Sequence, residues 1–296
     1  MARLRAARAA SMSIACLFPG QGSHSKGMGG GLFERFADWT ADADRILGYS
    51  IQELCVEDPR GELGLTGFTQ PALFVVNAMT YRAREEAGRP RPGYLAGHSL
   101  GEYNALHAAG AFDFATGLRL VQRRGLLMGR VYGGGMSAVI GLDPARIEHV
   151  LAASESGRRL DVANFNSFDQ TVIAGPKDDL ETTRAALLEA GARACLPLNV
   201  SAPFHSRYMK EAQDEFAAFL VGFTLAAPAI PVLANATGAP YDVAAVRETL
   251  ARQIGSSVRW LDSIVWLLDR GVTEFEEVGP GAVLTKLVAQ VKKKRG

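Results

Sequence analysis

The pentapeptide Gly97-His98-Ser99-Leu100-Gly101 directly follows the apolar run 94–96 and constrains the fold more than any other feature of the sequence. Glycines on either side of one serine let a strand turn sharply into a helix, with the serine hydroxyl standing clear of the backbone. We expect a strand over 94–97 and a helix that begins at Ser99. The free N–H groups of its first turn then lie near the hydroxyl and can stabilise an oxyanion. Because the pattern is degenerate, a glycine-rich turn formed by chance is the alternative interpretation.

Strand-like and helix-like segments alternate through the rest of the chain, which predicts an α/β fold with a mostly parallel sheet. Gly133 begins a stretch of about seventy residues with a different order, β-α-β-β-α-β, which is typical of a ferredoxin-like module. We therefore predict a large, α/β-hydrolase-like domain over 1–131 and 204–296, with a small ferredoxin-like domain inserted at 132–203. In the large domain we expect strands at 13–18, 94–97, 231–234 and 273–277, with helices at 32–47, 71–87, 100–110, 114–131, 206–221, 243–254 and 257–270 and a closing helix. In the small domain we expect strands at 136–141, 160–164, 170–174 and 194–198, with helices at 144–154 and 178–191.

Composition excludes several classes of protein. The chain has no run of about 18 uncharged apolar residues, so we expect no membrane partner. Its three cysteines are odd in number and far apart, which argues against a disulfide framework and favours a reducing cytoplasm. No pair of histidines has metal-ligand spacing, so no metal site is expected.

Charge gives little indication of a partner. The formal net charge of +1 produces no overall field for nucleic acid. The arginine-rich residues 1–11 superficially resemble a targeting peptide, but no long apolar segment follows them. We interpret them as a flexible extension or as the product of an upstream start codon.

A serine nucleophile needs a base, and His205 is the best candidate among the five histidines. It lies in a polar, proline-containing turn where the chain returns from the predicted insertion, a place expected at the mouth of an interdomain cleft. An ordinary histidine at a helix start is the alternative. His98 is next to Ser99, but neighbours at an elbow project differently, so we expect it to pack beside the site.

Arg124 is the second informative position. On a helix over 114–131 its neighbours three and four residues away are apolar, so the guanidinium is predicted to face inward. A buried guanidinium needs an anion or several carbonyl groups. A substrate carboxylate and an internal ion pair with Asp or Glu are both open interpretations.

The loop 20–24 follows the first predicted strand, at the edge where an open α/β sheet binds ligands. A phosphate-binding loop is a weak interpretation, because Met28 stands where a P-loop requires lysine. A loop that offers a backbone N–H to an oxyanion suits a serine nucleophile better.

Several motifs stand in register along the chain. They are Phe18-Pro19-Gly20-Gln21-Gly22-Ser23, Gln70-Pro71-Ala72-Leu73, Gly97-His98-Ser99-Leu100-Gly101-Glu102-Tyr103, Arg124-Gly125, Asn164-x-Asn166-Ser167, Phe204-His205-Ser206 and Glu277-Val278-Gly279-Pro280-Gly281. In this order and spacing they resemble the malonyl-CoA:acyl-carrier-protein transacylase family, and the resemblance covers residues 14 to about 290. Within that family the chain looks closest to the discrete, trans-acting acyltransferases of polyketide synthases, of the disorazole-synthase type.

The resemblance implies a role for each of several residues. It implies Ser99 as the nucleophile, His205 as the general base, and Arg124 as the ligand of the malonyl carboxylate. The implied oxyanion hole consists of the backbone amides of Gln21 and Leu100, and the carbonyl group of Gln253 would orient the histidine.

Phe204 accompanies malonyl specificity in the family, since a large ring leaves little room for a branch on the acyl group. His98 and Asn166 complete the implied site. His24 departs from the family, because many relatives have glutamine there, and Phe204 stands where the fatty-acid enzymes have serine.

The implied activity is a ping-pong transfer from malonyl-CoA, through a malonyl-serine ester, to the phosphopantetheine thiol of an acyl carrier protein. It implies no permanently bound cofactor and no nucleic-acid partner, and we expect a monomer. A serine hydrolase that acts on carrier-bound acyl groups is the main alternative, and Arg124 favours transfer over it. A catalytically silent docking subunit is a third interpretation.

Overall fold

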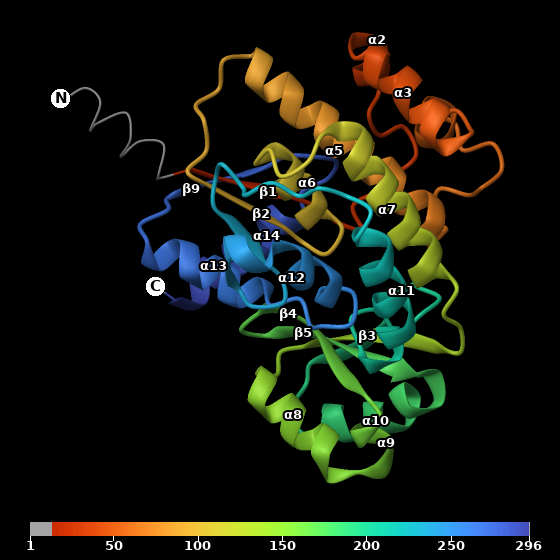
Figure 1. The fold of residues 1–296 in the computed structure, drawn as a ribbon. Coiled ribbons are helices and arrows are strands. Elements are labelled where there is room, and N and C mark those ends of the chain that lie inside the picture. The colour runs from red at the N-terminus through yellow and green to blue at the C-terminus, as the bar shows by residue number, and fades with distance from the viewer. Residues whose placement is uncertain (1–13, 296) are drawn as a thin grey trace.

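The computed structural model describes residues 14–295, and the arginine-rich residues 1–11 lie outside the described residues. A five-stranded sheet with the order β8-β7-β2-β1-β9 forms the centre of the larger part (Figure 1). Its strands are β1 (Ile14–Phe18), β2 (Tyr94–Gly97), β7 (Val232–Ala234), β8 (Ala239–Pro240) and β9 (Glu274–Glu277). All neighbours are parallel except β7 and β8. The predicted α/β fold with a mostly parallel sheet is thus confirmed, with β8 as an unpredicted antiparallel edge.

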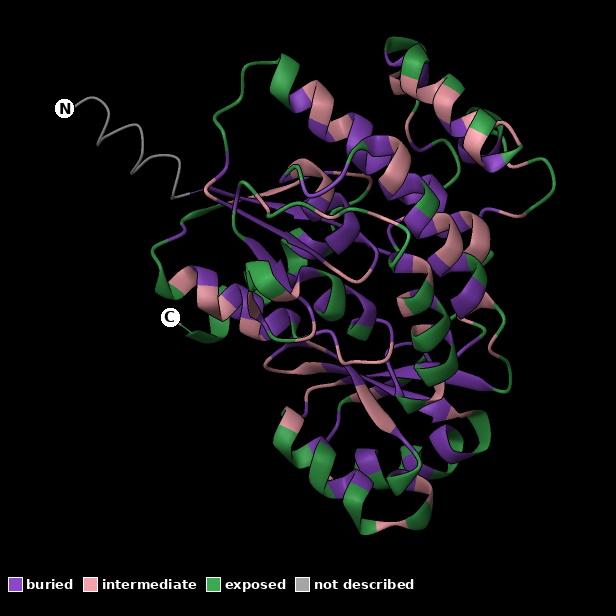
Figure 2. Ribbon diagram, in the orientation of Figure 1, coloured by how far each residue is buried: buried purple, intermediate pink, exposed green. Residues whose placement is uncertain are grey.

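The sheet is covered on both faces, which explains why β1 and β2 are almost entirely apolar and buried. Cys16 and Phe18 of β1 belong to a core cluster with α5 (Thr66–Glu86), α6 (Gly101–Ala108) and α7 (Phe114–Gly129). Ala15 and Leu17 alternate with them and belong to a second cluster with α13 (Trp260–Asp269) and α14 (Val283–Arg295). Figure 2 shows these strands buried between the helices.

The remaining helices of the larger part are α2 (Leu32–Arg35), α3 (Ala37–Leu47), α4 (Ile51–Val56), α11 (Lys210–Leu220) and α12 (Val246–Arg252). Short 3-10 turns, η1 (Arg207–Met209) and η2 (Val243–Ala245), precede α11 and α12. The single helix expected over 32–47 is interrupted at Phe36, whose φ of −114° and ψ of 54° are not helical. Helix α5 begins five residues earlier than predicted, because Pro71 lies inside it and does not start it.

A second, antiparallel sheet has the order β4-β5-β3-β6 and lies at the lower end of the molecule in Figure 1. Its strands are β3 (Gly134–Ile140), β4 (Asp161–Ser167), β5 (Gln170–Pro176) and β6 (Ala194–Pro197). The helices α8 (Pro144–Ala153), α9 (Glu155–Arg158) and α10 (Lys177–Glu189) belong to this part. Residues of β3, β5, α8 and α10 share a separate core cluster. The ferredoxin-like assignment and the predicted domain bounds stay predictions.

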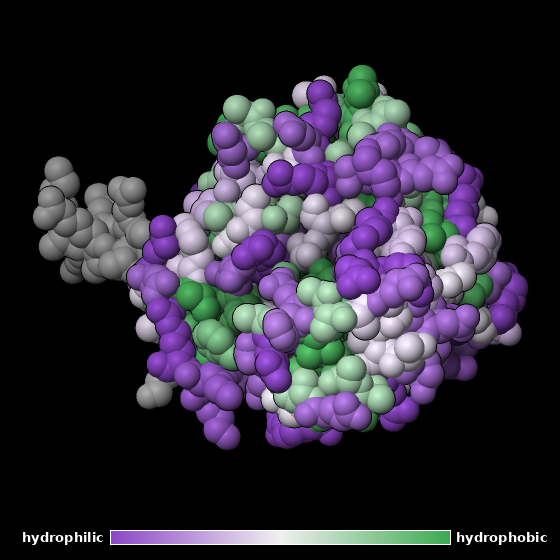
Figure 3. Space-filling view, turned by 90° about the horizontal axis from the view of Figure 1, so that it is seen from below, coloured by the Kyte–Doolittle hydropathy of each residue, from purple (hydrophilic) through white to green (hydrophobic). Residues whose placement is uncertain are grey.

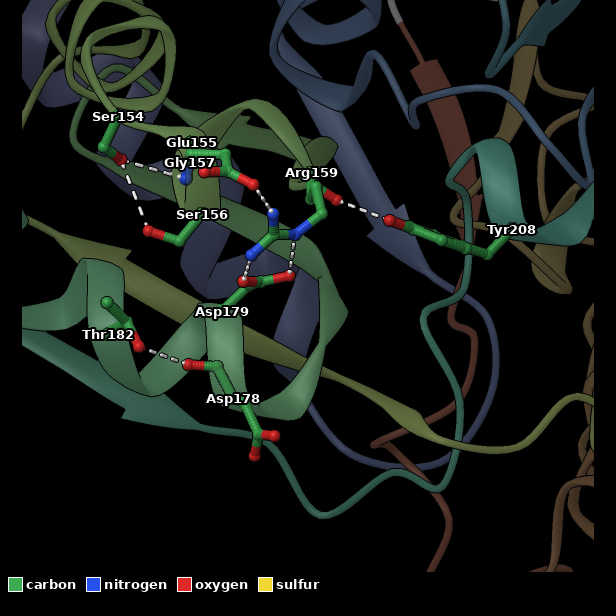
Figure 4. Close-up of polar contacts among 9 residues, drawn as sticks. All are labelled: Ser154, Glu155, Ser156, Gly157, Arg159, Asp178, Asp179, Thr182 and Tyr208. Carbon is green, nitrogen blue, oxygen red and sulfur yellow. Dashed lines mark hydrogen bonds and ion pairs between the residues drawn. The ribbon is translucent and has the colours of Figure 1, made fainter.

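Polar contacts connect this smaller part to the segment that follows residue 205. The Arg159 guanidinium binds Asp179 of α10 and Glu155 of α9, and the Arg159 carbonyl oxygen accepts a hydrogen bond from the Tyr208 hydroxyl at 2.9 Å (Figure 4). Arg207 also pairs with Asp161 at the start of β4. The residues just after His205 are thereby anchored to the second sheet.

The surface at this end, around α8, α9 and α10, is mostly hydrophilic, and hydrophobic residues gather there only in small areas (Figure 3). Within residues 14–295, none of the helices combines the length and the apolar character that crossing a bilayer requires.

Candidate active site

Ser99 lies at the tip of an elbow between β2 and α6, in the left-handed region of backbone conformation with a φ of 53°. The elbow is so tight, and packs so closely on the end of β1, that glycine is required. A Cβ atom added to Gly97 would lie 1.9 Å from the Gly101 carbonyl carbon, and one on Gly101 would lie 1.9 Å from the Phe18 carbonyl oxygen. The helix begins at Gly101 and not at Ser99, which corrects our prediction, since a residue at positive φ cannot form the first turn of a right-handed helix.

Asn235, which directly follows β7, holds this elbow with both ends of its side-chain amide. The Ser99 N–H donates to Asn235 Oδ1 at 2.6 Å, and Asn235 Nδ2 donates to the Gly97 carbonyl oxygen at 2.7 Å. Sequence reasoning missed this residue. The available signal was its position at the carboxyl end of a predicted strand, the edge where parallel sheets carry their sites.

The structure brings His205 to Ser99, with 2.7 Å between His205 Nε2 and Ser99 Oγ. His205 Nδ1 lies 3.0 Å from the Gln253 carbonyl oxygen and 3.1 Å from that of Ser256. Both oxygens accept only, so the ring proton belongs on Nδ1, and the lone pair of Nε2 faces the serine hydroxyl. Gln253 contributes the carbonyl group expected from the resemblance, whereas Ser256 was not predicted.

His205 is buried, with 4% of its surface exposed. Burial, followed by the positive charge of Arg124, lowers the pKa of His205 to about 3. The imidazole is therefore neutral near pH 7 and can accept the proton of the serine hydroxyl.

Arg124 of α7 is 1% exposed, and its guanidinium reaches the same hydroxyl. Nη2 donates to Ser99 Oγ at 3.1 Å and to Gln253 Oε1 at 3.0 Å, while Nη1 donates to Gln70 Oε1 at 2.7 Å. Within residues 14–295 Arg124 makes no hydrogen bond or ion pair with a carboxylate, so the internal ion pair that the sequence left open is not found. Gln70 belonged to a motif that we noted, but its contact with Arg124 was not predicted.

A cavity of about 400 Å³ contains these groups, and its walls come from loops and helices of the larger part and from β3, β4 and β5 of the second sheet. The sequence-predicted site residues that line it are Gln21, His98, Ser99, Leu100, Arg124, Asn166, Phe204 and His205. Gln253 lies behind this wall and is fully buried. A more open cavity of about 670 Å³ reaches His205 from the side of α8, but neither Ser99 nor Arg124 lines it. The first cavity is therefore the candidate active site.

Two backbone amides at the cavity wall have no acceptor among residues 14–295. Within the described part of the chain, neither the Gln21 N–H nor the Leu100 N–H donates a hydrogen bond. Both are therefore free to bind an oxygen atom of a ligand. His98 Nε2 lies 2.9 Å from Asn166 Oδ1, and this contact fixes the His98 ring in the wall, beside Trp260.

The sequence and the fold were compared with protein families, with curated proteins and with solved structures. The model of the acyl transferase domain family matches residues 16–295. The chain is 50% identical over 282 residues to the polyketide biosynthesis malonyl CoA-acyl carrier protein transacylase PksC of Bacillus subtilis, covering 95% of this chain and 97% of that protein. It is 51% identical over 277 residues to the polyketide biosynthesis protein ThaF of Burkholderia thailandensis, covering 94% of this chain. The chain spans only 24% of the length of ThaF. A solved malonyl CoA-acyl carrier protein transacylase from Burkholderia pseudomallei superimposes with a TM-score of 0.91 at 51% identity, covering 96% of this chain and 99% of that one.

Proposed function

The chain belongs to the acyl transferase domain family, and we propose that it moves a malonyl group from malonyl-CoA to the phosphopantetheine thiol of an acyl carrier protein. The observation that carries this proposal is the buried Arg124, which has no carboxylate partner within residues 14–295 and lies 3.1 Å from Ser99 Oγ. A positive charge in that position selects an acyl group that carries a carboxylate of its own.

In the first half of the reaction, Ser99 Oγ bonds to the thioester carbonyl carbon while its proton moves to His205 Nε2. The carbonyl oxygen becomes an oxyanion, which the free amides of Gln21 and Leu100 stabilise. When the C–S bond breaks, the thiolate of CoA takes the proton from His205 and leaves. A malonyl ester of Ser99 remains, with its carboxylate against Arg124.

In the second half, the phosphopantetheine thiol of the carrier protein gives its proton to His205 and attacks the ester carbonyl carbon. The C–O bond to Ser99 breaks, and Ser99 recovers its proton from His205. His205 can serve in both directions because the Gln253 and Ser256 carbonyl groups hold the Nδ1–H tautomer in place.

The walls of the cavity support malonyl as the acyl group. Phe204 is 6% exposed and lines the cavity next to His205, where a large ring limits the space for a branched acyl chain. His98, held by Asn166, faces the same space. The names of PksC and of the Burkholderia pseudomallei structure agree with this substrate and with an acyl carrier protein as acceptor.

The proposal also covers the domain organisation of the chain, its oligomeric state and its cellular compartment. We propose a small, ferredoxin-like domain at 132–203 inserted into a large, α/β-hydrolase-like domain, because the β4-β5-β3-β6 order suits that topology. We further propose a trans-acting monomer that needs no permanently bound cofactor and serves a polyketide synthase in the cytoplasm. The three buried thiols, which form no disulfide, suit a reducing compartment.

The main alternative is a hydrolase that releases acyl groups from carrier proteins to water, since the same serine and histidine serve both reactions. The two are separated by incubating the protein with malonyl-CoA labelled in the malonyl group and a phosphopantetheinylated carrier protein of a polyketide synthase. Transfer predicts label on the carrier, whereas label released mainly as free malonate identifies a hydrolase. No label on the enzyme, on the carrier or in malonate would indicate a catalytically silent docking subunit.

A further inference from the structure

A fully buried carboxylate, Glu102, lies beneath Ser99 in the first turn of α6, and no step of the transfer uses it. Its Oε2 accepts hydrogen bonds from the Asn235 backbone N–H at 3.1 Å and from Gln253 Nε2 at 3.0 Å. Its Oε1 accepts a hydrogen bond from the Tyr241 hydroxyl. Three hydrogen bonds to one buried side chain form a network that has to be satisfied as a whole.

Two of these partners hold Ser99 from opposite sides. Asn235 Oδ1 accepts from the Ser99 N–H at 2.6 Å, and Gln253 Nε2 donates to the Ser99 carbonyl oxygen at 2.6 Å. Glu102 therefore links the two residues whose side chains fix both peptide groups of the strained serine, Asn235 through its backbone N–H and Gln253 through its side-chain amide.

Gln253 extends this network to the other two groups of the site. Its carbonyl oxygen faces His205 Nδ1, and its Oε1 accepts from Arg124 Nη2. The Gln253 amide thus bridges the negative Glu102 and the positive Arg124, which share no direct hydrogen bond in the described part of the chain.

From this arrangement we propose that Glu102, as an ionised carboxylate, is a positioning residue that aligns Ser99, His205 and Arg124 through Asn235 and Gln253. This inference rests on the proposed function only in its assignment of these three groups as the reacting site. Both N–H partners of Oε2 can only donate, so the proton of a protonated Glu102 would have to sit on Oε1. The Tyr241 hydroxyl would then have to turn and accept, and its hydrogen bond to a charged carboxylate, which is stronger than one between neutral groups, would be lost. The three hydrogen bonds as found therefore favour the ionised form.

The network predicts that the reactivity of Ser99 depends on pH, and that the effect of Glu102 can be distinguished from that of His205. Burial raises the pKa of Glu102 to about 7, whereas the pKa of His205 is about 3. The other ionisable groups that face Glu102 are Arg124 of α7, Tyr103 of α6 and Tyr241 after β8. Burial raises the pKa of both tyrosines, and arginine stays charged, so none of these three changes charge between pH 5 and 9. A fall in serine reactivity as the pH drops through 7 is therefore assigned to protonation of Glu102.

The test measures the rate constant for modification of Ser99 by a fluorophosphonate probe between pH 5 and 9. This probe reacts with an activated serine whether or not malonyl-CoA is the substrate, so the result is independent of the proposed function. We expect the wild-type rate constant to fall below a midpoint near pH 7. In Glu102→Gln we expect a rate constant about 10-fold lower above pH 7, as the loss of one hydrogen bond implies, and no midpoint near pH 7.

Two further variants complete the experiment. Tyr241→Phe removes one donor to the carboxylate and should move the midpoint to higher pH, because the ionised form loses a hydrogen bond. Glu85→Gln on α5 replaces another carboxylate, which lines a different cavity, and should leave both the rate constant and the midpoint unchanged. A wild-type rate and midpoint in Glu102→Gln would overturn the proposal. If that variant does not fold, an unmoved midpoint in Tyr241→Phe overturns it.

Discussion

Replacing Arg124 with alanine should remove the preference for malonyl-CoA over acetyl-CoA while the serine remains reactive. Arg124 is 1% exposed and contacts Gln70, Ser99 and Gln253, all neutral groups. In the proposed complex the malonyl carboxylate gives the guanidinium its missing counter-charge. Acetyl-CoA lacks that carboxylate, so its loading does not depend on the pairing.

The size of the effect follows from the contacts of the guanidinium. A carboxylate that binds both terminal nitrogens makes two hydrogen bonds to a charged group, each worth about 1.5 to 3 kcal/mol. One of them replaces the existing Nη2 bond to Ser99 Oγ, so the net gain is near the lower end, about 3 kcal/mol in total. That energy corresponds to a ratio of about 10²-fold between malonyl and acetyl loading.

The assay is single-turnover loading of the enzyme by malonyl-CoA and by acetyl-CoA, measured as intact-protein mass. In Arg124→Ala we expect malonyl loading to fall by about 10²-fold and acetyl loading to change by no more than about 3-fold. Arg123→Ala is the matched control, because Arg123 is the next residue on α7 and its guanidinium binds the exposed Glu215 at 3.1 Å. It should leave the ratio of the two rates unchanged, since an exposed ion pair contributes little.

An unchanged ratio of malonyl to acetyl loading in Arg124→Ala would refute the carboxylate role, provided that the variant unfolds at the wild-type temperature. If the ratio is unchanged because both loading rates fall by the same factor, Arg124 acts on the reactivity of the serine alone. That outcome would leave the acyl specificity of the cavity unexplained.

Two other substitutions test the shape of the site. Phe204→Ser should let methylmalonyl-CoA load Ser99 at a rate closer to that of malonyl-CoA, since it removes a ring from the cavity wall; unchanged discrimination in the loading assay would exclude Phe204 as the steric filter. Gly101→Ala should lower the free energy of unfolding by about 3 kcal/mol or more, because its Cβ would lie 1.9 Å from the Phe18 carbonyl oxygen. Gly31→Ala is its control, with no atom within 4 Å of the added carbon and no positive φ, and equal denaturation midpoints for these two variants would contradict the close packing of the elbow.

Much of the fold followed from local patterns in the sequence. The buried strands β1 and β2 are continuous apolar runs, the first ended by Pro19-Gly20 and the second by Gly97, and both lie where the pattern predicts them. The elements that were missed are short: α4 has six residues, α9 four and β8 two. Segments of that length carry too little periodicity to identify, and tertiary packing decides their conformation.

The residues of the candidate site also fall into those that a local pattern identified and those that only the fold brings together. Ser99, His205 and Arg124 each carried a local signal, and the structure brings them within hydrogen-bond distance. Asn235 carried only its position after a predicted strand, and Glu102 only its place in the serine motif. Their contacts were not predicted, because they join residues 136 and 133 positions apart. The left-handed conformation of Ser99 was also not predicted, and it moved the start of the helix by two residues. Such features depend on tertiary contacts between segments that are far apart in the sequence, and local sequence patterns do not predict those contacts.

The site of covalent attachment of the acyl group tests the central claim most directly. The protein is incubated with malonyl-CoA, quenched in acid and digested, and the peptides are mapped by mass spectrometry. We predict one malonyl group per chain, attached to Ser99, which disappears when a phosphopantetheinylated carrier protein is added before the quench. A malonyl group on any other residue, or full loading of Ser99→Ala, would contradict the account.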